Sequence, residues 1–437
     1  MENYPDRTKA MTPCAMSEST LDSQHEELPR SSPSAIAPWP YFAEDEIQAA
    51  MQVLRSGRVN YWTGEEGRQF EREFAEFTGC KYAVALANGT VALEAALRAL
   101  GVGPGDEVIT TARTFIASAS CAVAVGARPV IADVDRDSQN ITAESIRAVL
   151  TQKTKAIVAV HLAGWPCEME EILALAQQYG LKVLEDCAQA QGATYKGLSV
   201  GSMGDAATFS FCQDKIMTTG GEGGVLTTND QNVWRRAWSY KDHGKDHDAV
   251  YVKKHPVGFR WVHESFGTNW RMTEMQSAIG RIALRKVPRW LETRRRFAGI
   301  LNESLAEIPG LRITRPPAEI EHAYYKYYVF IRPEALRAGW DRDRIMQAIV
   351  AKGIPCSVGS CSEIYLEAAF ARSRARKWRL PNAKELGETS LMFMVHPTLS
   401  EQDIRDTCVA VRKVMLEAGE PEACDIAATT TGSSRST

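Results

Sequence analysis

Between residue 40 and about residue 290, short apolar runs alternate with stretches whose apolar residues recur every three or four positions. The short runs predict strands at Tyr82–Leu86, Glu107–Thr110, Pro129–Val134, Ala156–Val160, Leu181–Leu184, Ala207–Phe211 and Gly224–Thr227. The periodic stretches predict helices around Met51 and Phe74, and at Thr90–Leu100, Ser145–Leu150 and Met169–Tyr179. This repeated alternation indicates an α/β domain with a central, mostly parallel sheet.

The pattern changes after Arg289, where a long charged helix is predicted over Trp290–Leu305. An extended aromatic run at Tyr324–Ile331 and helices near 341–352 and 402–417 then indicate a smaller α+β domain. Both ends of the chain are rich in Ser and Thr and show no periodicity. We therefore expect a flexible leader over residues 1–37, a large domain over 38–290, a small domain over 291–423 and a flexible tail over 424–437.

Composition narrows the classes of function. The 437 residues include 51 Lys and Arg and 54 Asp and Glu, a net charge of −3, so the chain lacks the basic excess of a nucleic-acid-binding protein. No apolar stretch reaches the roughly 20 residues that cross a bilayer, so we expect no membrane partner. The ten cysteines form no CxxC pair and no cluster with histidine at ligand spacing. We therefore expect reduced thiols in a cytoplasmic protein and no metal ion.

Three predicted strand ends carry side chains that are ordinary when taken one by one. Asp186 follows a buried strand, Lys215 lies five residues beyond Ser210, and Asn88-Gly89-Thr90 precedes a helix. Alone, these are most simply a turn residue, a solvated lysine and a helix cap. Ligands of open α/β sheets gather at the carboxyl ends of the strands, so together the three offer a carboxylate, an amine and a phosphate cradle. A phosphorylated pyridine cofactor needs all three groups.

Several ordered motifs extend this pattern over about residues 40–290. They are ANGTVALEAAL, GPGDEVITTARTFIAS, VHLAGW, EDCAQAQGA, TFSFCQDKIMTTGGEGG and GTNWRMTEMQSAIG. In this order they resemble the DegT/DnrJ/StrS group of pyridoxal-phosphate-dependent aminotransferases, the sugar aminotransferase branch of fold type I. The resemblance implies pyridoxal 5′-phosphate as cofactor, a large domain with a central, mostly parallel sheet, and a smaller C-terminal α+β domain.

The resemblance also implies roles for individual residues. Lys215 would bind the cofactor covalently and move protons during transamination, and Asp186 would pair with the ring nitrogen. The other implied cofactor contacts are Gln189 near the ring hydroxyl, Phe115 on the ring face, Gly89, Thr90 and Ser210 at the phosphate, and Asn269 at the phosphate of a neighbouring subunit's cofactor. This last contact implies a homodimer with shared active sites.

The substrates follow from the resemblance alone. It implies transfer of an amino group from L-glutamate to a keto-sugar, in the form of a nucleotide-linked keto-hexose, for the biosynthesis of amino sugars, polysaccharides or antibiotics. Tyr61 and Trp62 resemble a loop that borders the sugar site. Arg271 could hold a donor carboxylate, and it could equally pack at a dimer interface.

Three alternatives remain open at this point. A sugar dehydratase or an aminocyclitol aminotransferase would keep the cofactor and change the reaction or the substrate. Related dehydratases carry histidine in place of the lysine, so Lys215 favours an aminotransferase. A non-catalytic regulator that binds the cofactor need not keep both Lys215 and Asp186. Outside these motifs, His161 is best interpreted as a packed histidine at a strand end, and the tyrosines between 324 and 328 as strand packing, although one could line the pocket.

Overall fold

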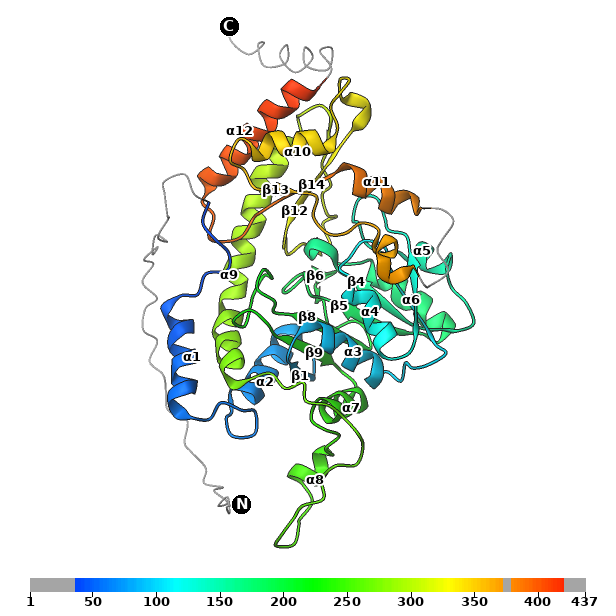
Figure 1. Ribbon diagram of the computed structural model, residues 1–437, viewed down its shortest axis with the longest axis vertical. Coiled ribbons are helices and arrows are strands. Elements are labelled where there is room, and N and C mark those ends of the chain that lie inside the picture. The colour runs from blue at the N-terminus through cyan, green and yellow to red at the C-terminus, as the bar shows by residue number, and fades with distance from the viewer. Residues whose placement is uncertain (1–35, 372–378, 420–437) are drawn as a thin grey trace. The chain divides into compact units, whose positions relative to one another are not determined.

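The computed structural model describes residues 36–371 and 379–419 (Figure 1). The predicted tail, and all but the last two residues of the predicted leader, lie outside these ranges. Contacts along the chain separate residues 1–37 from the compact unit that begins at Pro38, and the description below concerns that unit.

A seven-stranded sheet forms the centre of the unit. Its order is β1 (Tyr82–Leu86), β9 (Gly224–Thr228), β8 (Ala206–Ser210), β5 (Lys182–Asp186), β4 (Thr154–Val160), β2 (Glu107–Thr111) and β3 (Arg128–Ala132). From β8 to β3 every pairing is parallel, whereas β9 is antiparallel to both of its neighbours. The connection from β8 to β9 contains no crossover helix, which is why β9 returns in the opposite direction. All seven predicted strands are present, and the predicted mostly parallel α/β sheet is confirmed.

Helices cover both faces of this sheet, because successive strand residues point to opposite faces. One face packs on α3 (Gly89–Ala99), α4 (Ala117–Ala124) and α7 (Gln231–Lys241). The other face packs on α2 (Glu66–Thr78), α6 (Met169–Tyr179) and α9 (Glu274–Leu305). The predicted helix at Ser145–Leu150 corresponds to α5 (Ala143–Arg147) and the turn after it. Apolar residues therefore occupy both sides of the strands, and the sheet is the core of the unit.

The two predicted N-terminal helices are present but differ in what covers them. In α2, Phe70 and Phe74 are fully buried against the sheet. In α1 (Glu44–Ser56), Ile47 and Leu54 are 44% and 58% exposed, although they lie at helical spacing. The apolar pattern thus predicted the helix, and part of its apolar stripe is exposed among the residues that the structure describes.

The C-terminal region carries a second, antiparallel sheet. Its order is β10 (Leu311–Arg312), β12 (Tyr327–Ile331), β14 (Ser390–Phe393) and β13 (Cys356–Ser357). The helices of this region are α10 (Arg342–Val350), α11 (Pro381–Thr389) and α12 (Glu401–Ala418). The remaining elements are the sheet of β11 (Ile320–Glu321), β6 (Thr194–Tyr195) and β7 (Leu198–Ser199), helix α8 (His247–Tyr251), and 3₁₀ turns at Leu162–Gly164, Pro333–Ala335, Ile364–Leu366 and Ala368–Phe370.

Helix α9 begins sixteen residues before the helix predicted over Trp290–Leu305 and crosses residue 290, where the sequence predicted a domain boundary (Figure 1). The division into a large and a small domain stays a prediction. Within the described ranges no helix, α9 included, is both long and apolar enough to cross a membrane.

Candidate active site

A cavity of about 1060 Å³ opens at the carboxyl ends of β5 and β8. Residues from two parts of the chain line it. The cavity floor consists of its lining residues between Asn88 and Glu222, and the cavity wall of those between Tyr325 and Met394. Seven residues implicated by the sequence belong to the floor: Gly89, Thr90, Phe115, Asp186, Gln189, Ser210 and Lys215. The carboxylate, the amine and the helix N-terminus that follow the predicted strands therefore line one cavity.

Asp186 lies at the end of β5 and is 5% exposed. Its Oδ2 accepts a hydrogen bond from the Ser118 hydroxyl at 2.8 Å, and its Oδ1 accepts one from the Ala188 amide at 3.2 Å. These two donors fix the plane of the carboxylate. An ionised carboxylate only accepts hydrogen bonds, so the group suits a protonated ring nitrogen in the cavity. Ser118 was missed in the sequence, although it closes the quoted motif that ends in TFIAS.

The N-terminus of α3 faces the same cavity. Asn88 caps the helix by accepting a hydrogen bond from the Val91 amide at 3.0 Å, which leaves the amides of Gly89 and Thr90 in the uncapped first turn. A Cβ atom on Gly89 would lie 2.6 Å from the Cβ of Ser210. Only glycine therefore lets the helix start approach the end of β8. Free amides, a hydroxyl and the positive end of the helix dipole together form an anion site.

The main chain of Lys215 is anchored on both sides. Its amide donates to the Cys212 carbonyl at 3.1 Å, and its carbonyl accepts from the Trp39 indole nitrogen at 2.8 Å. The following residues, Ile216 and Met217, are fully buried. The side chain lines the cavity, with its Nζ 5.0 Å from the centre of the Tyr325 ring. The lysine therefore leaves a rigid loop and reaches into the cavity.

Two further floor residues, Gln189 and Phe115, have predicted roles at the cofactor ring that stay predictions. Gln189 is 7% exposed, and its Oε1 accepts a hydrogen bond from the Ala163 amide at 2.7 Å, which fixes the side chain beside the cavity. Phe115 is 67% exposed, which is unusual for a phenylalanine, and its side chain lines the cavity.

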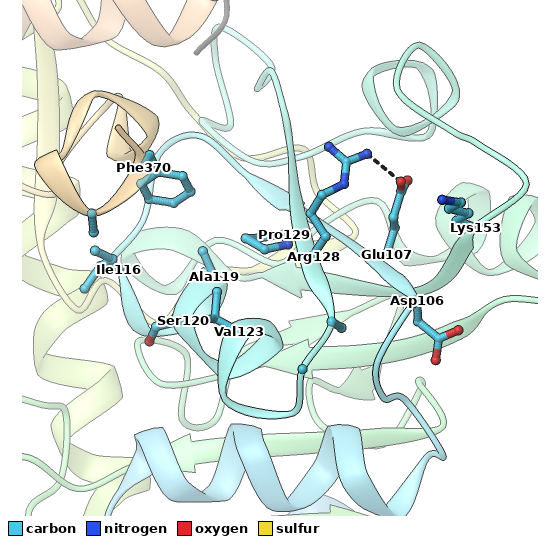
Figure 2. Close-up of a pocket in the computed structure, with 14 residues that line it drawn as sticks. Asp106, Glu107, Ile116, Ala119, Ser120, Val123, Arg128, Pro129, Lys153 and Phe370 are labelled. Atoms are coloured by element: carbon cyan, nitrogen blue, oxygen red, sulfur yellow. Dashed lines mark hydrogen bonds and ion pairs between the residues drawn. The ribbon is translucent and has the colours of Figure 1, made fainter. Parts of the chain in front are cut away.

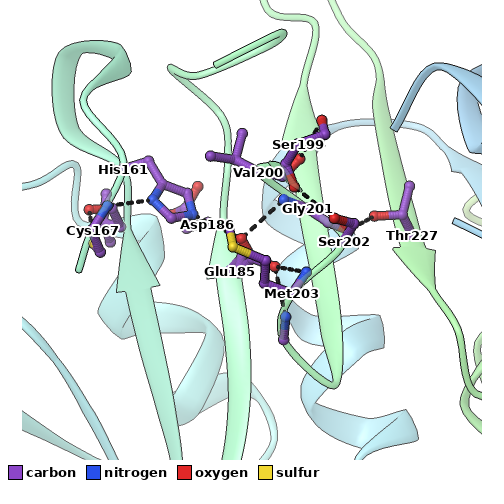
Figure 3. Close-up of polar contacts among 12 residues, drawn as sticks. His161, Cys167, Glu185, Asp186, Ser199, Val200, Gly201, Ser202, Met203 and Thr227 are labelled. Carbon is purple, nitrogen blue, oxygen red and sulfur yellow. Dashed lines mark hydrogen bonds and ion pairs between the residues drawn. The ribbon is translucent and has the colours of Figure 1, made fainter. Parts of the chain in front are cut away.

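A buried polar network supports the floor from below (Figure 3). The Nδ1 of His161 accepts from the Cys167 amide at 2.9 Å, so its Nε2 carries the proton and donates to Glu185 at 3.0 Å. Glu185 also accepts from the amides of Gly201, Met203 and Gly204 at 2.8–2.9 Å. Both side chains are fully buried. His161 is thus a packed histidine, as the sequence indicated, and it connects β4 to the residue beside Asp186.

His161, Glu185 and Cys187 also lie close enough together to share a metal ion. The ligand atoms of His161 and Glu185 are already engaged, because these two side chains hydrogen-bond to each other, His161 accepts from the Cys167 amide and Glu185 accepts from three further amides. Burial, and then the charge of Glu185, raise the pKa of the Cys187 thiol well above its usual value, which keeps the thiol protonated. The cluster is therefore a satisfied hydrogen-bond network.

A second cavity, of about 520 Å³, lies along α4 (Figure 2). Its apolar end includes Ile116, Val123 and Phe370, and its polar end includes Lys153 and the ion pair between Arg128 and Glu107. Ile116 lines both cavities. None of the candidate residues named from the sequence lines this second cavity.

Four implicated residues do not line the main cavity of this chain. They are Tyr61, Trp62, Asn269 and Arg271. Tyr61 is 3% exposed and its hydroxyl donates to Glu71 at 3.0 Å. Arg271 donates to the Asp242 carboxylate at 2.6 Å, and Asn269 pairs with Asp242 through the main chain. Their proposed contacts with a substrate or a neighbouring subunit stay predictions.

The cavity wall is the part of the site that sequence reasoning largely missed. It comprises Tyr325, Lys326, Tyr328, Gly359, Ser360, Cys361, Ile364, Glu367, Met392 and Met394. The aromatic run Tyr324–Ile331 was interpreted mainly as strand packing. Two of its tyrosines line the cavity: Tyr325, which precedes β12, and Tyr328, which lies within it. The donor set of the floor fits a phosphorylated pyridine ring, with its phosphate at α3 and its ring nitrogen at Asp186.

Comparisons with known proteins identify the family to which this sequence is similar. Residues 40–412 match the model of the DegT/DnrJ/EryC1/StrS aminotransferase family. The chain is 37% identical over 360 residues to a GDP-perosamine synthase of Caulobacter vibrioides, covering 81% of this chain and 92% of the synthase. It is 36% identical over 357 residues to a UDP-N-acetyl-3-dehydro-alpha-D-glucosamine 3-aminotransferase of Acidithiobacillus ferrooxidans, covering 82% and 90%.

A solved structure extends the agreement to the fold. An aminotransferase from Psychrobacter cryohalolentis is 55% identical, with a TM-score of 0.86, over 88% of this chain and 99% of the other. Both the α/β sheet and the C-terminal region fall within this match.

Proposed function

We propose, from the premise that this chain belongs to the DegT/DnrJ/EryC1/StrS aminotransferase family, that it transfers an amino group from L-glutamate to a nucleotide-linked keto-sugar. Membership makes the protein a pyridoxal-phosphate-dependent aminotransferase, and the predicted family, fold, enzyme class and cofactor are thereby confirmed. The proposal adds the identities of the two substrates, the site residues and the assembly.

The observation that carries the proposal is the meeting of Lys215 and Asp186 in one cavity with the N-terminus of α3. Pyridoxal phosphate, when bound, supplies an electron sink for removing a proton next to nitrogen. Asp186, held by Ser118, would keep the ring nitrogen protonated. Gly89, Thr90 and Ser210 would bind the phosphate, and Phe115 would cover one face of the ring. Lys215 would accept and return the proton that moves during transamination.

The sugar substrate is supported by the relatives whose names specify one. GDP-perosamine synthase and the UDP-linked 3-aminotransferase both name a nucleotide-linked sugar. A cavity of about 1060 Å³ is at the upper end of the usual range for a small-molecule site, which leaves space for a sugar beside the cofactor.

Two half-reactions test the substrates separately. The purified holoenzyme is mixed with L-glutamate alone, and the visible absorbance of the cofactor is followed. Loss of the band supports glutamate as donor, and an unchanged band contradicts it. The aminated enzyme is then offered a panel of GDP-, UDP- and dTDP-linked keto-sugars. Return of the band with one member identifies the acceptor, and no return with any member contradicts a nucleotide-linked sugar.

The assembly we propose is a homodimer with shared active sites. The segment that follows α8 projects from the rest of the unit (Figure 1). It exposes apolar side chains that one copy leaves uncovered: Val252, Val257, Phe259, Trp261 and Phe266, each 70% exposed or more. Asn269 follows this segment and does not line the cavity of its own chain, which is consistent with a contact to a second copy. Exposed patches of this kind mark association surfaces.

Subunit complementation tests the shared site. Lys215→Ala and Asn269→Ala chains, each inactive or weakened alone, are combined into mixed dimers. If Asn269 serves its neighbour, one site of each mixed dimer contains both native residues and activity returns. If Asn269 serves its own chain, both sites remain defective and no activity returns. Light scattering measures the mass of the unaltered protein in solution, and a monomeric mass would also contradict the proposal.

We place the enzyme in the cytoplasm. The eight described cysteines are all free, and four of them, at positions 121, 167, 187 and 408, are buried. Free thiols suit a reducing compartment. Cell fractionation with antibody detection tests this placement.

A further inference from the structure

Lys326 is a second lysine that lines the cavity, in addition to Lys215. Its side chain is only 12% exposed, and buried lysines are rare because an unpaired charge is costly to remove from water. Its polar neighbours are the Met394 sulfur at 3.2 Å, a weak acceptor, and the Asp214 Oδ2 at 4.0 Å. Among the described residues, no oxygen accepts a hydrogen bond from this ammonium group.

Asp214 is a poor partner for Lys326. Its carboxylate accepts a hydrogen bond from the Tyr325 hydroxyl, and its side chain is 54% exposed to solvent. At 4.0 Å from the ammonium, a half-solvated carboxylate gives little attraction. The positive charge of Lys326 therefore remains largely uncompensated inside the cavity.

The main chain holds Lys326 in this position. Tyr324 adopts a left-handed conformation with φ of 47°, and its amide donates to the His322 ring at 2.7 Å. The buried guanidinium of Arg294 donates to the carbonyls of Tyr324 and Tyr325, at 3.2 and 3.1 Å. A strained turn held by a buried arginine fixes the direction of the residues that follow it.

Two lysine ammonium groups of the cavity lie close to the Tyr325 ring. The Nζ atoms of Lys215 and Lys326 lie 5.0 and 4.7 Å from the centre of that ring. Burial lowers the pKa of Lys326 to about 8, with Arg294 and Lys215 adding to the decrease and Asp214 opposing it. Lys326 is thus mostly protonated at neutral pH and loses its charge in mildly alkaline solution.

We propose that Lys326 binds a carboxylate of a substrate in this cavity. The proposal rests on the proposed function, in which L-glutamate enters and 2-oxoglutarate leaves, each with two carboxylates. A keto-sugar that bears a carboxylate is a second source of the same group. Either would supply the missing anionic acceptor and form a charge-assisted hydrogen bond with the ammonium. Lys326 is then a residue that selects substrates by charge.

The first test measures the donor half-reaction of the holoenzyme with L-glutamate alone. Lys326→Met keeps the length of the side chain and removes its charge, and we expect the KM for glutamate to rise about tenfold with little change in kcat. Lys326→Arg should restore most of the affinity. Lys352→Met is the matched control, because Lys352 is 29% exposed, pairs with Glu417 at 3.8 Å and lies outside the cavity.

The pH profile separates a charge role from a packing role. In the unaltered enzyme, kcat/KM for glutamate should fall above about pH 8 as Lys326 loses its proton. Lys326→Arg should not show this component, because arginine stays protonated. The charged and titratable groups around Lys326 are Asp214, Lys215, Arg294, Tyr325 and His396. All five remain in both proteins, so a difference between the profiles reports position 326.

Binding of glutarate to the same proteins by calorimetry provides a readout without turnover. Glutarate carries two carboxylates and no amine, and glutaramide is its neutral control. We expect Lys326→Met to weaken glutarate binding about tenfold and to leave glutaramide unaffected.

The outcomes distinguish this inference from the proposed function. No reaction of the unaltered enzyme with glutamate overturns the donor, and glutarate binding then decides the role of Lys326 alone. A loss confined to sugars that bear a carboxylate supports the carboxylate role and assigns it to the acceptor. Equal behaviour of Lys326→Met and the unaltered enzyme towards glutamate, glutarate and such sugars overturns the inference.

Discussion

The cavity floor and the cavity wall hold their side chains in different ways. Asp186 on the floor has two hydrogen-bond donors within the protein, and Glu185 beneath it has four. Lys326 on the wall has a thioether and a distant carboxylate. A group satisfied by the protein is ready before any ligand arrives, whereas a group left unsatisfied gains most from one. We therefore propose that the floor binds the cofactor, which is common to all substrates, and that the wall selects among substrates.

The largest effect is expected at Lys215. Replacing it with alanine removes both the covalent attachment and the proton carrier, so activity should fall on the order of 10⁴-fold for every substrate. The visible absorbance band of the purified holoenzyme should disappear as well. An unchanged circular dichroism spectrum would show that the protein is still folded, and a persistent band would refute the assignment of Lys215.

Asp186→Asn tests whether the floor acts on all substrates alike. The amide cannot hold the ring nitrogen protonated, and we expect kcat to fall on the order of 10²–10³-fold with every sugar. Asp205→Asn is a suitable control, since Asp205 pairs with Lys182 at 2.6 Å and lies outside the cavity. A loss for one sugar and not another would break the distinction between floor and wall.

Glu185→Gln tests the support beneath the floor. A glutamine amide would face hydrogen-bond donors, so the free energy of unfolding should fall by about 3 kcal/mol. Urea denaturation at pH 7 measures this. Glu170→Gln, at an exposed glutamate, should leave the midpoint nearly unchanged.

Acidification sharpens the same test. Burial alone would raise the pKa of Glu185, but the His161 hydrogen bond and the Gly201 and Gly204 amides outweigh it and the pKa is lowered. This stabilisation is present above the unfolded pKa of about 4.3 and is lost as the pH falls through the lower folded value. The glutamine variant should lack this acid-dependent component. An identical acid profile would contradict a charged Glu185.

The smallest effect is expected on the wall. Tyr328→Phe removes the hydroxyl that accepts a hydrogen bond from the Ser360 amide at 2.9 Å. The loss of this bond costs about 1 kcal/mol of the free energy that holds the Ser360 loop in place. We expect a change of a few fold in the KM of the sugar and little change in kcat. Tyr327→Phe, whose hydroxyl donates to Asn302 at 3.0 Å outside the cavity, should leave KM unchanged. Equal effects of the two variants would contradict a selective wall.

The sequence was most informative about elements that depend on a short local pattern of apolar residues. Seven strands were predicted because each is a short apolar run bounded by turns, and parallel strands place their ends together. We could therefore predict that Lys215 and Asp186 lie at the same edge of the sheet, and both line one cavity. The antiparallel direction of β9 depended on a long connection without a helix, which apolar patterning does not report.

The sequence was least informative where a residue's role depends on distant segments. Ser118 is separated from Asp186 by 68 positions, so nothing local indicated their hydrogen bond. Lys326 lies in an aromatic run typical of a packed strand, and its direction is set by a left-handed residue and by Arg294 from α9. The sequence also did not show how far α1 is buried: its spacing predicted an apolar stripe, but Ile47 and Leu54 are 44% and 58% exposed in the described part of the chain.

Helix α9 links these two regions mechanically. In its first half, Ala283, Leu284 and Val287 pack against the large sheet. Further along, Arg294 donates a hydrogen bond to the turn that precedes Lys326. Thirty-two residues in one helix span about 48 Å. Because both regions pack on this helix, unfolding of one region removes part of the packing of the other. We therefore expect the cavity floor and the cavity wall to unfold together, so that a substitution that destabilises one region also lowers the stability of the other.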